Sequence, residues 1–145
     1  LGGRKMAEYT AVALQTVEPG NNILFTETAI CGNSSIFHRE GSGLFTLRGI
    51  TCQCRARFKV TFGGNIAIPT GGTVAPISFA IAINGEGVPS TTMIATPAAA
   101  EEFSNVSSTI FIDIPSGCCS QISVKNVGTE ATDVQNANII VERVA

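Results

Sequence analysis

Apolar and polar residues alternate along much of this chain with the two-residue period of β-strands. The clearest stretch, residues 54–62, places alanine, phenylalanine and valine on one face and arginine, lysine and threonine on the other. Residues 77–83 repeat the pattern, with isoleucine and phenylalanine on one face and Ser78, Ala80 and Ala82 on the other. No window has a convincing helical stripe, so the pattern predicts β-structure throughout.

Glycine and proline interrupt the alternation at regular intervals, which is typical of short strands joined by turns. Further strands are predicted at residues 11–17, 23–28, 35–39, 44–48, 88–96, 106–114, 121–127 and 137–144. The pair Asn84-Gly85 is a strong tight-turn signal, because such turns need positive φ. Residues 97–103 fit either a single helical turn or a loop. The chain is therefore predicted to be all-β, a sandwich or barrel of about 8–10 antiparallel strands.

The last predicted strand has large apolar residues on both faces. Ile139, Ile140 and Val141 are consecutive, so their side chains alternate between the two faces. This is typical of a central strand that is covered on both sides. In a two-layer sandwich one face meets the core, and the other is dry only if a second subunit covers it. We therefore predict that these three residues contribute to a subunit interface.

The chain also carries few charges: 14% of its residues are charged, against about 25% in an average soluble domain. A shortage of charge often means that surface is buried against copies of the chain or against a partner. Ser78, Ala80 and Ala82 fit either an ordinary outer sheet face or the close approach of another sheet or subunit. The low charge favours the second alternative, so we include these residues in the predicted interface.

Composition argues against several classes of protein. A hydrophobic content of 44% with a net charge of −2 excludes a disordered chain. The 15 glycines and 6 prolines leave no apolar run long enough for a membrane span. The slightly acidic balance argues against a general nucleic-acid binder, which needs a basic field. We therefore predict neither a nucleic-acid nor a membrane partner.

The length of 145 residues suits one domain with a substantial core. Residues 1–5 are interpreted as cloning residues or upstream translation, and Met6-Ala7-Glu8 as a natural start. Residues 6–145 then form a single domain. Because no secretory signal follows Met6, we expect synthesis in a cytoplasm.

The five cysteines are Cys31, Cys52, Cys54, Cys118 and Cys119. An odd number without a signal peptide favours reduced, partly buried thiols. Disulfides formed after release from the cell, or a metal site, are the alternatives. Cys52 and Cys54 would share one strand face, whereas Cys118 and Cys119 would point to opposite faces. Because a Cys-x-x-Cys pair or a histidine at ligand spacing is missing, we predict no metal and no other cofactor.

Arg55, Arg57 and Lys59 form a basic ladder on one face of their predicted strand. Half-exposed antiparallel strands commonly have such a face in contact with solvent. The alternative is contact with an acidic protein surface. Nucleic acid is the least favoured ligand, because no aromatic residues interleave with the charges as stacking platforms. The three residues are therefore candidate contacts for a protein partner.

The sequence offers no catalytic constellation. A nucleophilic serine or cysteine needs an imidazole beside it and an orienting carboxylate, and His38 is the one histidine. Gly41-Ser42-Gly43 and Gly71-Gly72 lie in predicted β-turns, whereas phosphate-binding loops lie between a strand and a helix. We therefore predict that the chain is not an enzyme, has no catalytic residue, and uses His38 at its surface or at an interface.

Three segments resemble known proteins. Residues 122–144, ISVKNVGTEATDVQNANIIVERV, resemble the closing hairpin of tumour-necrosis-factor-like jelly rolls, the family of the complement globular heads. In its bacterial branch, the C-terminal domains of collagen-like spore-surface glycoproteins also end in QNAN followed by alternating aliphatic residues. Over residues 6–145 the chain resembles short phage and prophage structural proteins of Firmicutes, through AEYTAVALQTV at 7–17, PTGGTVAPIS at 69–78 and the Cys118-Cys119 pair. Unlike the spore-surface proteins, it has no Gly-X-Y repeat before the domain.

The resemblance implies a two-layer antiparallel jelly-roll sandwich that associates as a homotrimer around its inner sheets. It further implies a non-enzymatic structural protein of the virion, which decorates or stabilises a phage capsid or belongs to a tail or fibre. Its further partner would be the major capsid or tail protein, and it would be made in the host cytoplasm. The alternative is a trimeric head on a bacterial spore or cell surface that recognises host glycan or protein. The lack of tryptophan and the single tyrosine weaken the glycan alternative, because sugar sites favour exposed aromatic platforms.

Overall fold

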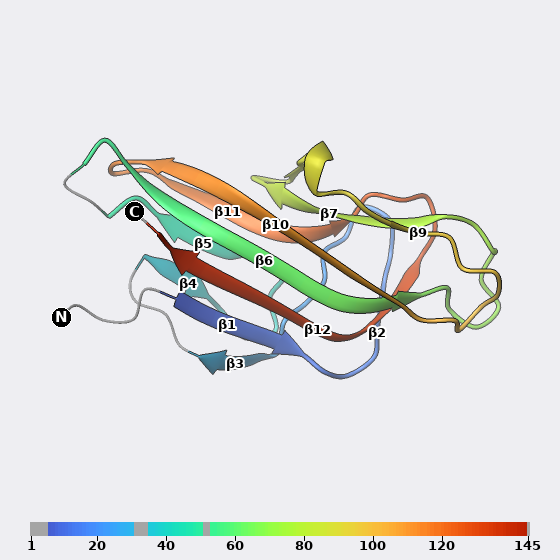
Figure 1. Ribbon diagram of the computed structural model, residues 1–145. Coiled ribbons are helices and arrows are strands. Elements are labelled where there is room, and N and C mark those ends of the chain that lie inside the picture. The colour runs from blue at the N-terminus through green and yellow to red at the C-terminus, as the bar shows by residue number, and fades with distance from the viewer. Residues whose placement is uncertain (1–5, 31–34, 51–52, 145) are drawn as a thin grey trace.

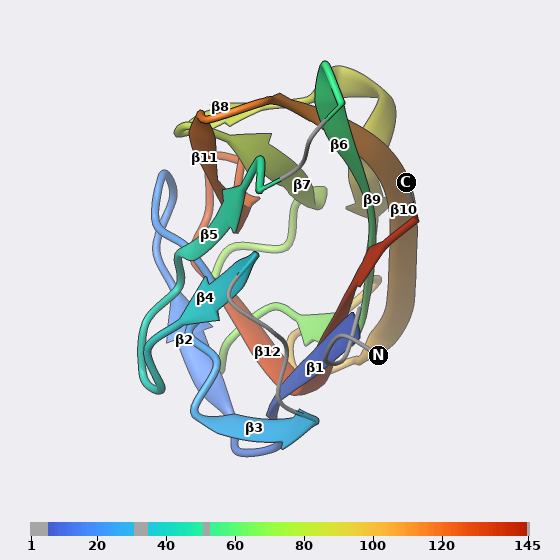
Figure 2. The same ribbon diagram turned by 90° about the vertical axis from the view of Figure 1, so that its left-hand side faces the viewer.

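The computed structural model describes residues 6–30, 35–50 and 53–144. In these ranges the chain forms two six-stranded antiparallel sheets that pack face to face (Figure 1 and Figure 2). Sheet I has the order β10-β6-β12-β1-β3, with β2 paired to one end of β12. Sheet II has the order β4-β5-β11-β7-β8, with β9 paired to β7. The chain crosses between the sheets repeatedly, from β6 to β7 and from β10 through β11 to β12, in the manner of a jelly roll.

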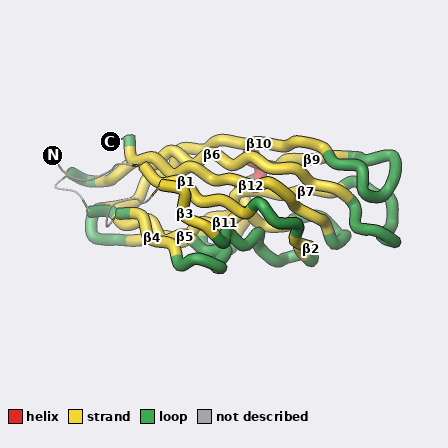
Figure 3. Tube along the Cα trace, turned by 90° about the horizontal axis from the view of Figure 1, so that it is seen from below, coloured by secondary structure: helices red, strands yellow, loops and turns green. Residues whose placement is uncertain are grey.

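The strands of each sheet differ widely in length. Sheet I comprises β1 (Met6–Ala11), β2 (Gln15–Val17), β3 (Glu27–Ile30), β6 (Arg55–Ala67), β10 (Ser104–Pro115) and β12 (Thr132–Arg143). Sheet II comprises β4 (Ile36–His38), β5 (Phe45–Arg48), β7 (Ile77–Ile83), β8 (Glu86–Gly87), β9 (Met93–Ala95) and β11 (Cys119–Asn126). The described strands outnumber the predicted ones because the strand predicted at 11–17 is divided between β1 and β2, and because β8 is an additional short strand. Most loops gather at the ends of the long strands (Figure 3).

Large side chains from both sheets fill the space between them. The largest fully buried ones are Phe25, Phe45, Phe58, Phe62 and Phe79. Phe25 contacts Phe45 and Phe62 edge to face, with ring centroids 5.3 and 6.3 Å apart. Phe58 and Phe62 lie on the face of β6 that the alternation assigned to the core, so that part of the prediction is confirmed.

Strand β12 lies between β6 and β1, which confirms the predicted central position of the closing strand. Its register with β6 shifts between Gln135 and Asn138, and Asn136 has a φ of 55°. This bulge lets Val134 and Ala137, three positions apart, both face the core. The single strand predicted at residues 11–17 is wrong for the same reason, since β1 pairs with β12 beyond the bulge and β2 pairs with it before the bulge.

Strand β7 and the turn after it match the sequence prediction, whereas the segment that follows them differs from it. Strand β7 has the predicted bounds, and Asn84 and Gly85 adopt φ values of 52° and 88° in the turn to β8, as predicted. The strand predicted at residues 88–96 is a 3-10 turn, η1 (Pro89–Thr91), followed by β9. Residues 97–103 form a loop, the second predicted alternative, in which the Glu101 amide donates to the Ile68 carbonyl at 2.8 Å.

Candidate interaction surface

The outer face of sheet I is formed by side chains that point away from the core. Along β6 every second residue faces outward, which places Arg55, Arg57 and Lys59 on this face. Pairing with β10 adds Asp113 and Phe111, the cross-strand partners of Arg57 and Lys59. The other strands contribute Asn138, Ile140 and Glu142 of β12, Met6, Glu8 and Thr10 of β1, and Glu27 and Ile30 of β3.

Asp113 binds two of the three basic residues of the ladder. Arg57 donates from Nε to Oδ1 at 2.7 Å and from Nη2 to Oδ2 at 3.1 Å, and Arg55 Nε lies 3.1 Å from Oδ2. The hydrogen bond with Arg57 lowers the pKa of the Asp113 carboxyl and raises the pKa of the Arg57 guanidinium. All three side chains are exposed, so the cluster adds little to stability. Its effect is to hold Arg55 and Arg57 side by side.

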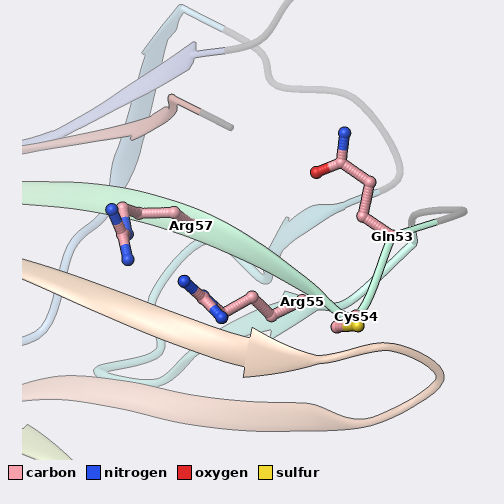
Figure 4. A pocket seen from close by; sticks show the side chains of 4 residues that line it. All are labelled: Gln53, Cys54, Arg55 and Arg57. Carbon is pink, nitrogen blue, oxygen red and sulfur yellow. The ribbon is translucent and has the colours of Figure 1, made fainter.

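The two arginines line an open pocket at one end of this face. The pocket has a volume of about 250 Å³ and is also lined by Gln53 and Cys54. In Figure 4 both guanidinium groups extend from neighbouring outward positions of β6, and Cys54 lies where the strand begins. Asp113 engages Arg55 through Nε, and the Arg55 side chain remains 58% exposed. The lining is polar and basic, so it suits an acidic group of a partner rather than an apolar one.

Two residues of this face were missed by sequence reasoning. Neither Asp113 nor Phe111 belongs to a motif in the sequence. Pairing of β6 with β10 brings Arg57 and Asp113 together although 56 positions separate them in the chain. Phe111 is 60% exposed beside Lys59. In the predicted strand 106–114, Phe111 falls on the same face as serine and threonine, and this pattern was the signal that could have identified it as an exposed aromatic residue.

The predicted interface residues of the closing strand separate into two groups. Ile139 and Val141 point into the core with no exposed surface, so neither reaches a second subunit, and their assignment is corrected. Ile140 lies half-buried on the outer face of sheet I, between Thr61 of β6 and Glu8 of β1. The strand thus has a large apolar residue on each face as predicted, although Asn138 and Glu142 flank Ile140 on the outer face. Whether a second subunit covers Ile140 stays a prediction.

Ser78, Ala80 and Ala82 lie on sheet II, on the opposite side of the molecule from Ile140. Ala80 and Ala82 are already buried within the chain, with 1% and 0% of their surface exposed. Lys125, the cross-strand partner of Ala80, donates from Nζ to the Gly85 carbonyl at 3.0 Å, and Gly87 of β8 packs against Ala80. Ala80 and Ala82 are therefore covered by their own chain and do not reach a second subunit, whereas Ser78 is only half-buried. A contact of Ser78 with a second subunit stays a prediction.

His38 lies in β4 at the edge of sheet II, half-buried among aromatic rings. Its ring centroid is 4.3 Å from that of Phe45, nearly parallel, and 4.6 Å from that of Tyr9 in sheet I. Nε2 lies 2.8 Å from the Ser42 carbonyl, so it carries the proton and donates, which leaves Nδ1 buried without a partner among the described residues. Burial lowers the pKa of His38, opposed by the Ser42 hydrogen bond and by Glu40. His38 therefore links the two sheets while it stays partly exposed at the edge of sheet II. Its use at an interface stays a prediction.

Cys54, Cys118 and Cys119 are free and exposed. They lie in neighbouring loops and strand ends, since the Ser116 amide donates to the Cys54 carbonyl and the Gly49 amide to the Cys118 carbonyl. The prediction of partly buried thiols is wrong for these three residues, because this end of the sandwich is open to solvent. Cys31 and Cys52 lie outside the described residues, as does the predicted shared face of Cys52 and Cys54.

In the described part of the chain, no three histidine, cysteine, aspartate or glutamate side chains gather closely enough to hold a metal ion. This part of the chain also contains no helix of the length and apolarity that a membrane crossing requires. The absence of a cofactor stays a prediction.

Comparisons with known proteins bear on the fold. No protein-family model and no curated protein matches the chain. Among solved structures, the globular domain of zebrafish complement 1qA matches with a TM-score of 0.68 and 8% identity, over 98% of each chain. Eiger TNF from S. frugiperda matches with a TM-score of 0.71 and 11% identity, over 100% of this chain and 94% of that one. Murine APRIL matches with a TM-score of 0.61 and 8% identity, over 95% and 99%.

These matches cover nearly the whole chain at very low identity, so they establish the fold alone. The predicted resemblance to tumour-necrosis-factor-like and complement globular domains is confirmed at that level. The bacterial and phage branch of the resemblance stays a prediction. The chain has the two-layer antiparallel jelly-roll fold that these tumour necrosis factor and complement domains share.

Proposed function

We propose that this chain is a non-enzymatic, homotrimeric jelly-roll domain that acts by binding. The observation that carries the proposal is the set of apolar side chains that point outward from sheet I among charged residues. Ile140 lies near the middle of this face on the central strand, and Phe111 is 60% exposed on the edge strand β10. No described element of the chain packs over this face. Jelly rolls of the resembled family associate through such sheets, which would give both side chains a dry environment.

Within this class we propose a structural role in a virion, on a phage capsid or on a tail or fibre. The support is the resemblance of residues 6–145 to short phage and prophage proteins. The protein would be made in the host cytoplasm and would bind the major capsid or tail protein. Arg55, Arg57 and Lys59 are the proposed partner contacts, because the polar, basic pocket beside them suits acidic groups.

The alternative is a trimeric head on a spore or cell surface that recognises host glycan or protein. One observation favours it. Phe37 is 48% exposed, and the Arg48 guanidinium lies 5.4 Å from its ring centroid. An exposed aromatic ring with a cation beside it is a common element of recognition surfaces.

Sedimentation equilibrium of the purified chain tests the trimer. We expect a mass of about three times 15.0 kDa at micromolar concentration. Ile140→Asp should dissociate the assembly, because burying an unpaired carboxylate costs several kcal/mol, roughly. Ile94→Asp is the matched control, since Ile94 is 66% exposed on β9 of the other sheet. A monomeric unmodified chain, or equal effects of the two variants, contradicts the proposal.

Immunogold electron microscopy of phage particles from an induced lysogen tests the virion role. Labelling at regular positions on the capsid or on the tail is the expected result. Particles without label, together with label on the cell or spore surface, would support the alternative instead. Flanking capsid and portal genes in the genome would give independent support.

A further inference from the structure

Charges on the outer face of sheet I are segregated by strand. The basic residues lie on β6 with one acidic residue, Asp113 of β10, beside them, whereas the other acidic residues lie on β12, β1 and β3. Lys59 and Glu142 are cross-strand partners and mark the boundary between the two sides. We define the basic side by Arg55, Arg57 and Lys59, and the acidic side by Glu8, Glu27 and Glu142.

Local partners do not remove this asymmetry. Asp113 on β10 offsets part of the basic side, but one carboxylate is shared by two arginines. Arg143 belongs to β12, yet its Cα partner is the core residue Phe58, and its guanidinium donates to the Ile50 carbonyl at 2.7 Å, away from the outer face. The basic side therefore keeps an excess of positive charge. The strands of the acidic side, β12, β1 and β3, contribute no outward-facing basic residue among the described residues.

Two carboxylates of the acidic side can accept hydrogen bonds from a partner. Glu27 is exposed on the edge strand β3, and among the described residues it has no ion-pair partner. Glu8 is half-buried, and its Oε2 accepts a hydrogen bond from the Asn138 side-chain amide at 3.2 Å, which leaves the second oxygen for another donor.

Apolar surface accompanies both sides of the face. Phe111 lies on the far flank of the basic side, beside Lys59. Met6 and Ile30 lie on the acidic side and are 40% and 38% exposed. Apolar contact is non-directional, so it stabilises an interface without fixing its orientation. Complementary charges do fix orientation and register.

We propose that this face binds a second copy of the chain, with the basic side of one copy against the acidic side of the next. The proposal rests on the proposed trimer and specifies which sides meet. In a closed ring each copy presents one surface to one neighbour and a different surface to the other. A face with one basic and one acidic side meets that requirement, because each interface then pairs opposite charges.

Charge reversal tests the pairing in the full chain. Glu8→Lys with Glu27→Lys makes both sides basic, and we expect the concentration at half-dissociation to rise about tenfold or more at roughly 50 mM salt, where surface charges are weakly screened. The control, Glu86→Lys with Glu102→Lys, adds the same charge at exposed positions outside this face. It should change the concentration at half-dissociation by less than about twofold. Sedimentation velocity over a concentration series measures both.

The decisive variant combines Glu8→Lys and Glu27→Lys with Arg55→Glu and Lys59→Glu. Two of the three charges on each side are then reversed, so the net charge of each side changes sign, each interface again pairs opposite net charges, and assembly should return to within about threefold of the unmodified chain. Arg57 is kept so that Asp113 retains its partner. Circular dichroism melts establish that each variant is folded. If the lysine pair does not fold, Glu8→Gln with Glu27→Gln replaces it, with an expected weakening of about threefold.

Each outcome has a distinct meaning. Equal assembly of the Glu8/Glu27 reversal and its control, or no recovery in the combined variant, overturns the charge pairing while leaving the trimer in place. A monomeric unmodified chain overturns the trimer and the pairing together.

Discussion

Truncation of the adjacent isoleucines of β12 should affect different properties, the stability of the fold at Ile139 and self-association at Ile140. Ile139 is fully buried in the core, so Ile139→Ala should lower the free energy of unfolding by about 2–5 kcal/mol through lost burial and the cavity left behind. For a domain of this size that is a fall in Tm of roughly 4–20 °C. Ile140 lies half-buried on the outer face, so Ile140→Ala should cost the isolated chain about 1 kcal/mol or less. The same change should weaken self-association.

Denaturant titration measures the free energy of unfolding of each variant. It is carried out below the concentration of half-dissociation, so that the chain is monomeric and assembly does not contribute. The chain has no tryptophan and one tyrosine, and Tyr9 is 3% exposed between His38 and Phe45. Tyrosine fluorescence therefore reports on the core. Equal losses for the two variants would mean that Ile140 is packed inside its own chain. An Ile139→Ala variant of unchanged stability would refute the core assignment.

Three other predictions concern titration and reactivity. Because burial lowers the pKa of His38 in the folded chain, the unfolded chain takes up the proton first as the pH falls below about 6.5. The contribution of His38 to stability should therefore be constant above that pH and decrease below it. His38→Gln, which can still donate a hydrogen bond to Ser42, should flatten this pH dependence in thermal melts. An unchanged slope would contradict the mechanism. Arg57→Gln should raise the pKa of Asp113 toward its usual range in a carboxyl NMR titration, and no rise would mean that the pair is absent in solution. Cys54, Cys118 and Cys119 should react with a thiol reagent in the folded protein, each assigned by its serine variant, and protection of any one would contradict its exposure.

Alternation identified the strand faces but not what covers them. Residues 77–83 form a strand with the predicted bounds, yet the small-residue face is closed by β8 and by Lys125. Strand β8 spans only Glu86–Gly87, which is too short to leave a periodic signal. A small-residue face therefore looks the same in sequence whether another subunit or the chain's own turn lies on it.

Strand pairing was the other information that the sequence did not contain. The basic ladder was predictable because its residues share one strand. Its partner Asp113 and the opposing Glu8 and Glu27 come from strands distant in the chain, and only the sheet order places them on one face. The central position of β12 was predictable because a doubly apolar strand needs cover on both sides.

The bulge at Asn136 makes the closing strand far more sensitive to length than to composition. With one residue fewer, every side chain beyond that point would turn to the opposite face. Ile139 and Val141 would then face outward, while Asn138, Ile140 and Glu142 would have to enter the core. Substitution in this segment changes one contact at a time, whereas a single-codon deletion exchanges the inside of the sandwich for its outside. Related chains should therefore diverge freely in sequence here while keeping the spacing between Val134 and Val141 constant.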